Sequence, residues 1–273
     1  MSILKILDLF DTEQMSKDEL DVFKSRREAF KKLGNLSKKL SVAALPAGIL
    51  TSLPKVAFAQ EAPSVVEVLN YALTLEHLEY NFYQMGIDSG VAADSTAVIE
   101  QIRKHELAHV EFLQDVIANT LMGTPVESPT FDFTAGGTFA DVFTNSATFM
   151  ALAQAFEDTG VRAYKGQAAN LKGTEPGENI VLTAALSIHG VEARHASQIR
   201  RMRELKGWIT QAQAIEGVPA TAPVYAGEDN LTQGGVDVTT LPGDVSADAA
   251  SEAYDEPLTM EAVLEIAGLF IVQ

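Results

Sequence analysis

One arrangement of acidic and imidazole side chains occurs twice in this sequence. In each half of the chain, a single glutamate precedes a Glu-x-x-His step. The six residues are Glu76, Glu106 and His109, then Glu157, Glu192 and His195. With 22 Glu and 5 His in 273 residues, random placement gives only about 0.4 such steps, so two in this order carry information. Residues i and i+3 share one face of a helix, so each step aims an oxygen and a nitrogen at one point.

A tyrosine repeats together with the single glutamates. Tyr83 lies seven residues after Glu76, and Tyr164 lies seven residues after Glu157. Seven residues make about two helical turns, so each tyrosine shares a helix face with its glutamate. This internal repeat indicates two helical hairpins that pack together. Each tyrosine fits two roles, either as a proton or electron donor at the site or as a core aromatic.

Apolar residues surround the glutamates at helical spacing, which predicts that the carboxylates are buried. Leu73 precedes Glu76, and Phe156 and Val161 flank Glu157. Unpaired buried carboxylates are costly, so several that converge need protons or cations between them. Four carboxylates and two imidazoles on four helices form the ligand set of a two-metal site in a four-helix bundle. We therefore predict that the six side chains bind two metal ions, and oxygen ligands favour iron or manganese over copper.

The segments that carry these residues have the end signals of helices. Ser64 and Glu67 form a capping box for the first helix, which we expect to end at Gly86. Ser95 is the expected cap of the second. The four expected helices are Ser64–Met85, Ser95–Leu121, Ser146–Leu171 and Asn179–Leu205. Glycines inside the last two helices reduce helix stability, and we expect them to allow close approach of backbones. They are Gly160, Gly166 and Gly190.

The remaining segments complete an all-α architecture. Residues 124–145 contain prolines and a Gly-Gly pair, and they indicate a long crossover between the second and third helices. Residues 216–257 are rich in Gly, Pro, Thr, Asp and Ala and predict an irregular arm, for which Trp208 is the expected packing anchor. The helical pattern of Thr259–Val272 is short, so this helix is stable only when docked. We predict three regions: an export segment (1–59), the bundle (60–210) and the C-terminal arm (211–273).

The charge distribution separates the N-terminal segment from the rest. The first 59 residues hold 10 of the 20 Lys and Arg and 7 of the 37 Asp and Glu. Ten basic and 30 acidic residues remain, which gives a net charge of −20 from residue 60 onward. This charge argues against nucleic acid and anionic membrane surfaces as partners. The chain has no Cys, so disulfides, thiolate sites and iron–sulfur clusters are excluded.

The N-terminal segment has the order of features of an export signal. Residues 25–31 carry the pair Arg26 and Arg27 of a twin-arginine signal, and a mildly apolar stretch follows at 40–53. A small-x-small cleavage signature ends at Ala59. The apolar stretch is too short for a stable membrane span. We predict periplasmic or extracellular localisation through twin-arginine export, and the alternative is a basic amphipathic N-terminal helix.

Three phrases around the glutamates resemble the ferritin-like superfamily. They are LTLEHLE at 73–79, FEDTGV at 156–161 and VEARH at 191–195. The tail EPLTM at 256–260 is similar to exported ferritin-like domain proteins related to plant desiccation-associated proteins. The resemblance implies a ferritin-like four-helix bundle. It also implies that Glu106 and Glu192 bridge two iron or manganese ions, while Glu76 and Glu157 each bind one.

Several functions remain open within this resemblance. It implies a di-iron or di-manganese centre that handles peroxide, oxygen or ferrous iron in stress protection, with ferroxidase, peroxidase and manganese-catalase-like chemistry as alternatives. A non-catalytic structural or desiccation-stress protein with a metal-binding or vestigial site is the rival interpretation, and an iron buffer is a third. The expected partner is a small molecule. A homodimer stays open, whereas the long tail argues against a 24-subunit cage.

Four further residues lie near the predicted ligands in the sequence. Glu79 lies one helical turn from Glu76 and fits a supporting residue, an extra ligand or a solvated acid. His105 and His189 fit supporting or surface positions rather than ligands. His77 adjoins Glu76 in sequence but points about 100° away around the helix, so it is not expected at the site.

Overall fold

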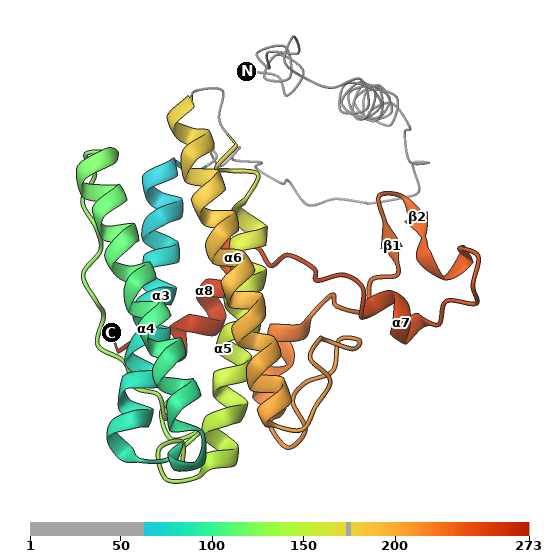
Figure 1. The fold of residues 1–273 in the computed structure, drawn as a ribbon, viewed down its shortest axis with the longest axis horizontal. Helices are drawn as coiled ribbons and strands as arrows, with labels where there is room; N and C mark the ends of the chain where they lie inside the picture. The colour runs from blue at the N-terminus through green and yellow to red at the C-terminus, as the bar shows by residue number, and fades with distance from the viewer. Residues whose placement is uncertain (1–62, 173–175, 273) are drawn as a thin grey trace, which may run out of the picture. The chain divides into compact units, whose positions relative to one another are not determined.

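The computed structural model describes residues 63–172 and 176–272, and the predicted export segment lies outside this range. Four long helices lie side by side (Figure 1). They are α3 (Val65–Ser89), α4 (Thr96–Asp115), α5 (Ser146–Gln167) and α6 (Pro176–Met202). A 3₁₀ turn, η1 (Ala93–Ser95), leads into α4, and a π-helical turn, η2 (Val116–Thr120), follows it. The all-α bundle is thereby confirmed. No helix among the described residues has both the length and the hydropathy needed to cross a membrane.

The first helix begins as expected and ends one turn later than expected. The backbone N–H of Glu67 donates to Ser64 Oγ at 3.2 Å, and the Ser64 N–H donates to Glu67 Oε2 at 2.7 Å. The expected end at Gly86 was wrong, because α3 continues to Gly90, which has a left-handed φ of 73°. Gly86 has another role: a Cβ there would overlap the ring of Phe149. The missing side chain lets α5 pack closely against α3.

Ser95 occupies the N-cap position of the second helix, as expected. Its side chain makes no capping hydrogen bond, because the 3₁₀ turn η1 runs directly into α4 without an extended cap residue. The third helix has a side-chain cap instead at Asn145, whose Oδ1 accepts the N–H of Ala147 at 3.0 Å.

The glycines inside the helices differ in which atoms lie next to the position of a missing Cβ. A Cβ at Gly166 would overlap the backbone oxygen of Leu258, so this glycine does allow a close backbone approach. At Gly160 the neighbours are side chains, with Glu79 Oε1 at 3.1 Å and Glu192 Oε2 at 3.3 Å from the added atom. At Gly190 nothing lies within 4 Å, so the expected close approach was wrong there.

The crossover between α4 and α5 pairs with the C-terminal end of the chain. Phe131 and Ile271 form an antiparallel bridge. The N–H of Asp132 donates to the Phe270 carbonyl at 2.8 Å, and the N–H of Val272 donates to Thr130 O at 2.9 Å. These bonds satisfy the extended backbone of the crossover and hold the last residues against the bundle.

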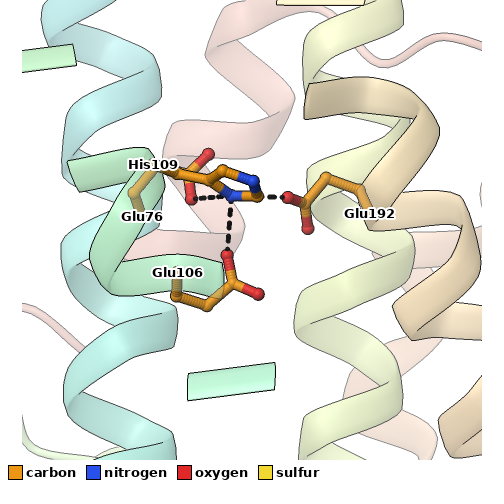
Figure 2. A group of neighbouring side chains, drawn as sticks. All are labelled: Glu76, Glu106, His109 and Glu192. Atoms are coloured by element: carbon orange, nitrogen blue, oxygen red, sulfur yellow. Dashed lines mark hydrogen bonds and ion pairs between the residues drawn. The ribbon is translucent and has the colours of Figure 1, made fainter. Parts of the chain in front are cut away.

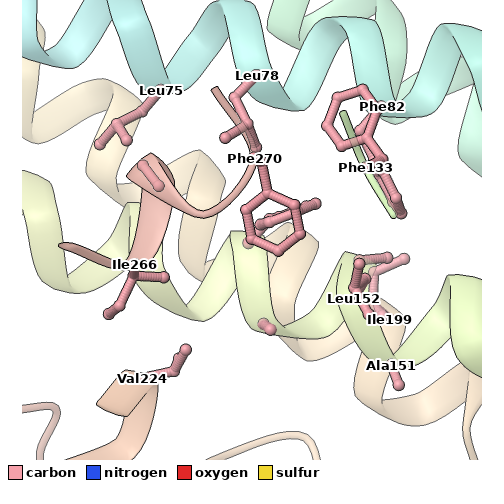
Figure 3. Close-up of a cluster of buried hydrophobic side chains, with 14 of the residues drawn as sticks. Leu75, Leu78, Phe82, Phe133, Ala151, Leu152, Ile199, Val224, Ile266 and Phe270 are labelled. Carbon is pink, nitrogen blue, oxygen red and sulfur yellow. The ribbon is translucent and has the colours of Figure 1, made fainter. Parts of the chain in front are cut away.

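An aromatic cluster forms the centre of the larger hydrophobic core (Figure 3). Phe82 of α3 stacks on Phe149 of α5, with centroids 4.7 Å apart and ring planes at 11°. Phe133 of the crossover and Phe156 of α5 meet Phe82 edge-on at 5.2 and 4.9 Å. Phe270 meets Phe156 edge-on at 4.9 Å. The core therefore joins α3, α5, the crossover and the C-terminal end.

The C-terminal arm contains short elements rather than only irregular chain. They are η3 (Pro219–Tyr225), β1 (Thr232–Gln233), β2 (Val236–Asp237), η4 (Val238–Thr240), α7 (Ala247–Ser251) and α8 (Met260–Gly268). The strands β1 and β2 pair as an antiparallel hairpin. Helix α8 is capped by Thr259 and packs against α3 and α5. Trp208 is 47% exposed, so the expectation that it anchors the arm was wrong.

A buried arginine on α5 holds the arm instead. Arg162 is fully buried and donates to the carbonyl oxygens of Val224, Ala226 and Glu256. Its Nε also lies 2.8 Å from the Glu228 carboxylate, which is 1% exposed. Two stretches of the arm, residues 224–228 and Glu256, therefore converge on one guanidinium group, whose planar set of donors suits several acceptors at once.

Candidate metal centre

The structure brings the six predicted side chains together inside the bundle. Helix α3 contributes Glu76, α4 contributes Glu106 and His109, α5 contributes Glu157, and α6 contributes Glu192 and His195. The four glutamates are fully buried, His195 is 5% exposed, and the His109 side chain is 12% exposed. The i, i+3 spacing works as expected, because each Glu-x-x-His step presents both of its side chains to the same interior point.

Two clusters of potential ligand atoms share this interior. In the first cluster, His109 Nδ1 lies 3.1 Å from Glu76 Oε2, 3.0 Å from Glu106 Oε2 and 3.3 Å from Glu192 Oε1 (Figure 2). One ring nitrogen can donate only one proton, so it cannot satisfy three carboxylates. The geometry is that of ligand atoms grouped around one cation.

The second cluster has the same chemistry and poorer hydrogen bonding. His195 Nδ1 lies 2.8 Å from Glu106 Oε1, 3.3 Å from Glu157 Oε2 and 3.9 Å from Glu192 Oε2. Although the first contact is short, its atoms are not aligned as a hydrogen bond. Within the described part of the chain, four of these buried atoms have no hydrogen-bond partner: His195 Nδ1, Glu106 Oε1, Glu157 Oε2 and Glu192 Oε2. Glu192 Oε1 has none there either. Burying polar atoms without hydrogen-bond partners costs free energy. A cation among these atoms would satisfy them better than the hydrogen bonds they can form with one another.

Two glutamates face both clusters. Glu106 turns Oε2 toward His109 and Oε1 toward His195. Glu192 likewise turns Oε1 toward His109 and Oε2 toward His195. The two carboxylates therefore lie between the clusters, in the position that a bridging ligand requires. Glu76 and Glu157 each face one cluster only.

Each of the two tyrosines binds the glutamate of the opposite half. The Tyr83 hydroxyl on α3 donates to Glu157 Oε1 at 2.5 Å, and the Tyr164 hydroxyl on α5 donates to Glu76 Oε1. Because the other oxygen of each glutamate faces a histidine, the tyrosine determines which oxygen is free for a ligand contact. Burial, with the charge of the bound glutamate, raises the pKa of both phenols, so they keep their protons.

Glu79 is a fifth buried carboxylate at this site. It is 3% exposed, which excludes the solvated-acid interpretation. Its Oε1 lies close to Gly160 on α5, as does Glu192 Oε2, so a side chain at Gly160 would crowd both acids. Sequence reasoning gave Gly160 no role at the site. Burial, followed by the charges of Glu192 and Glu157, raises the pKa of Glu79 well above its ordinary value.

Burial and mutual repulsion set the protonation of the clustered groups. Burial raises the pKa of Glu106 to about 7, although the nearby His109 and His195 oppose the shift. Burial alone would lower the pKa of His195, but Glu157 and Glu106 outweigh it and raise this pKa to about 11. The pKa of His109 is also raised, because contacts with three carboxylates outweigh its burial. For these three groups the folded protein therefore favours the protonated form.

The remaining histidines differ in their relation to the site. His105 Nδ1 lies 2.9 Å from His195 Nε2, so His105 is a direct neighbour of a predicted ligand. His189 Nδ1 bonds the Val161 carbonyl at 3.0 Å. His77 is buried, and its Nε2 has no hydrogen-bond partner among the described residues. The signal for His105 was its position four residues before His109, on the same helix face.

The comparison with family models agrees with the observed fold. Residues 64–205, just over half of the chain, match the family model of the ferritin-like domain. Among curated proteins, none matches this chain. The matched range contains all six predicted ligands, both tyrosines and Glu79.

Proposed function

This chain belongs to the ferritin-like domain family, and on that premise we propose that it holds a di-iron or di-manganese centre that handles peroxide, oxygen or ferrous iron. Two observations support the proposal. Around His195, buried carboxylate oxygens and a ring nitrogen have no hydrogen-bond partner among the described residues. Beside them, three carboxylates are grouped on one nitrogen of His109. A structural bundle gains nothing from such atoms, since each costs free energy unless a cation or proton satisfies it.

The six side chains divide into terminal and bridging ligands. Glu76 and His109 would hold one ion, and Glu157 and His195 would hold the other. Glu106 and Glu192 would bridge, since each presents one oxygen to each cluster. The ligand set of four carboxylates and two imidazoles suits iron or manganese more than copper. When bound, such a pair supplies reversible one-electron and two-electron chemistry toward oxygen species.

The tyrosines are proton-bearing groups in direct contact with the terminal carboxylates. Tyr83 keeps its hydroxyl proton and donates a hydrogen bond to Glu157 Oε1. Tyr164 does the same toward Glu76 Oε1. We propose that they hold these carboxylates in place and can pass a proton or an electron to the centre. Both side chains are buried, which keeps their hydroxyl groups out of direct contact with bulk water.

The closed interior limits the reactants to small ones. The four predicted glutamate ligands are fully buried, and His109 is the most exposed of the six side chains. Peroxide, oxygen and a ferrous ion are small enough for such a site, whereas a large organic substrate would require the helices to separate.

Metal analysis and peroxide consumption test this proposal together. Protein from its own host should contain two iron or manganese ions per chain and should consume peroxide or oxidise ferrous iron. Glu106→Gln removes a charged bridging ligand and should leave at most one ion per chain. It should also reduce turnover at least about 100-fold, as expected for loss of a metal ligand.

Glu100→Gln is the matched control on the same helix. Glu100 is exposed and pairs with Lys104 at 3.4 Å, so its substitution should change neither metal content nor turnover. Full metal content and activity in Glu106→Gln would reject the proposed site. Two bound ions without any turnover would instead favour the alternative, a structural or desiccation-stress protein with a metal-binding bundle.

We also propose that the protein reaches the periplasm or the cell exterior through twin-arginine export. The support is sequence alone: Arg26 and Arg27, the apolar stretch after them and the cleavage signature at Ala59. A route that carries folded proteins would let the metal be inserted before export. Replacing both arginines by lysine should retain the protein in the cytoplasm, and unchanged export would reject the route.

A further inference from the structure

A chain of three side chains leads from the second cluster toward solvent. His195 Nε2 lies 2.9 Å from His105 Nδ1. His105 Nε2 lies 2.8 Å from the Gln101 side-chain atom placed as the amide nitrogen, Nε2. The two imidazole planes are nearly parallel, at 8°, with centroids 5.1 Å apart. The 2.9 Å contact between the two nitrogens is closer than two stacked ring faces approach each other, so the rings meet at their edges, as an in-plane N–H···N bond requires. Gln101 is exposed, so the chain ends at the surface.

The contact with His105 bears on which ring nitrogen of His195 carries the proton. Its Nδ1 faces Glu106, Glu157 and Glu192, so a bound ion would take the lone pair of that nitrogen. A neutral imidazole with a lone pair on Nδ1 carries its proton on Nε2. That proton needs an acceptor, and His105 Nδ1 is at hydrogen-bond distance.

The same tautomer can continue along the chain. If His105 accepts at Nδ1, it carries a proton on Nε2, which must meet an acceptor at Gln101. The amide oxygen supplies one when the amide is turned by 180°, since the two ends of an amide are assigned from their hydrogen bonds. All three groups are then satisfied at once.

Only one of the two predicted ligand histidines, His195, has a histidine hydrogen-bonded to its outer nitrogen among the described residues. The two proposed metal positions therefore differ. On α4, His105 and His109 stand at i and i+4, so one helix provides the ligand for the first position and the support for the second. In the described part of the chain, no side chain bonds the outer nitrogen of His109 in the same way.

We propose that His105 is a positioning residue for the second metal position, where it accepts the Nε2 proton of His195 and holds Nδ1 toward the carboxylates. This inference rests on the proposed two-metal function. It predicts that loss of the His105 acceptor weakens the ion held by Glu157 and His195 and spares the ion held by Glu76 and His109.

Two substitutions at one position separate hydrogen bonding from packing. His105→Asn keeps an acceptor, because Asn Oδ1 stands as many bonds from Cα as His Nδ1 does. His105→Leu fills similar space without an acceptor. Each metal-free protein is titrated with Co²⁺, whose visible spectrum reports each binding step. The wild type should bind two ions. His105→Leu should bind the second ion about 10- to 100-fold more weakly, and His105→Asn should stay within about threefold of the wild type.

A second readout observes the tautomer directly. The chain has five histidines, so ¹⁵N-histidine labelling of the Zn²⁺-loaded protein gives few signals. The wild type and His105→Asn should show a slowly exchanging Nε2 proton on His195, and this protection should be lost in His105→Leu. His189→Leu is the control, because His189 bonds a backbone carbonyl and should leave both Co²⁺ steps unchanged.

The outcomes distinguish this inference from the proposed function. Equal binding of two ions by the wild type and His105→Leu would overturn the role of His105 and leave the two-metal site intact. Equal weakening in His105→Asn and His105→Leu would also overturn it, because packing alone would then explain the loss. A wild type that binds no ion would overturn both.

Discussion

At the scale of single residues, Arg162 joins the C-terminal arm to helix α5. Its guanidinium group meets three arm carbonyls and the buried Glu228 carboxylate. Breaking a buried ion pair by removing one partner leaves an uncompensated charge, which costs about 3–5 kcal/mol. We therefore expect Arg162→Met to lower the free energy of unfolding by this amount, measured in denaturant.

A double substitution shows whether the stranded charge causes the loss. Arg162→Met with Glu228→Met should recover part of the stability, because no unpaired carboxylate then remains. The exposed Arg194 is the control, and Arg194→Met should change stability by less than about 0.5 kcal/mol. A loss below about 1 kcal/mol in Arg162→Met would contradict the role of this residue in holding the arm.

The residues of the site were predictable to different degrees. The six clustered side chains carry a local signal, since helix geometry converts the Glu-x-x-His spacing into a shared direction. Glu79 was ambiguous, because its spacing from Glu76 does not say whether α5 covers it. Arg162 gave no signal, since its partners are mainly backbone carbonyls distant in sequence, and any residue type provides a carbonyl.

At the scale of elements, helix existence was easier to predict than helix ends. Four helices follow from apolar periodicity, but their ends depend on contacts with other helices. Gly86 looked like a stop signal, although it lies inside α3 where the Phe149 ring needs space. Ser95 does stand at the N-cap of α4, but its side chain makes no capping hydrogen bond after the preceding 3₁₀ turn. A sequence pattern contains neither of these tertiary contacts.

Two helical glycines provide opposite predictions about packing. Gly86→Ala would force a methyl group into the Phe149 ring, so α3 and α5 must separate, and we expect a loss of about 1–3 kcal/mol. Gly190→Ala adds a methyl group where nothing lies within 4 Å, so it should gain about 0.5–1 kcal/mol from helix propensity. Thermal unfolding of the two variants measures both effects. Equal shifts in the same direction would show that the helix contact does not depend on Gly86.

At the scale of the whole molecule, the bundle is built around charge that it must neutralise. Glu79, Glu106 and Glu192 all have raised pKa values, with burial as the first cause. Both clustered histidines have raised pKa values, because the carboxylates outweigh their burial. For all five groups the folded protein therefore binds protons more tightly than the unfolded chain does, and metal ions compete with these protons for the same atoms.

This competition predicts opposite pH profiles for the metal-free and metal-loaded protein. A raised pKa in the folded state gives stability that is present at low pH and lost as pH rises. For Glu106 the loss falls between pH 4.5 and about 7, and for His195 between pH 6.5 and about 11. The pKa shift of Glu106 alone corresponds to about 3 kcal/mol. His77, His105 and His189 oppose this trend below about pH 6.5, because burial lowers their pKa values.

We therefore expect the midpoint temperature of thermal unfolding to decrease as the pH is raised from 6.5 to 9 in the presence of a chelator. In the presence of Mn²⁺ it should rise over the same range, because deprotonated acids bind the ion more tightly. Glu106→Gln removes a carboxylate that raises the pKa of His109 and of His195, so its metal-free profile should be flatter over this range. A metal-free profile that rises with pH would show that the buried acids are ionised in the folded protein without cations, and the account of the site as a proton-filled cluster would then be wrong.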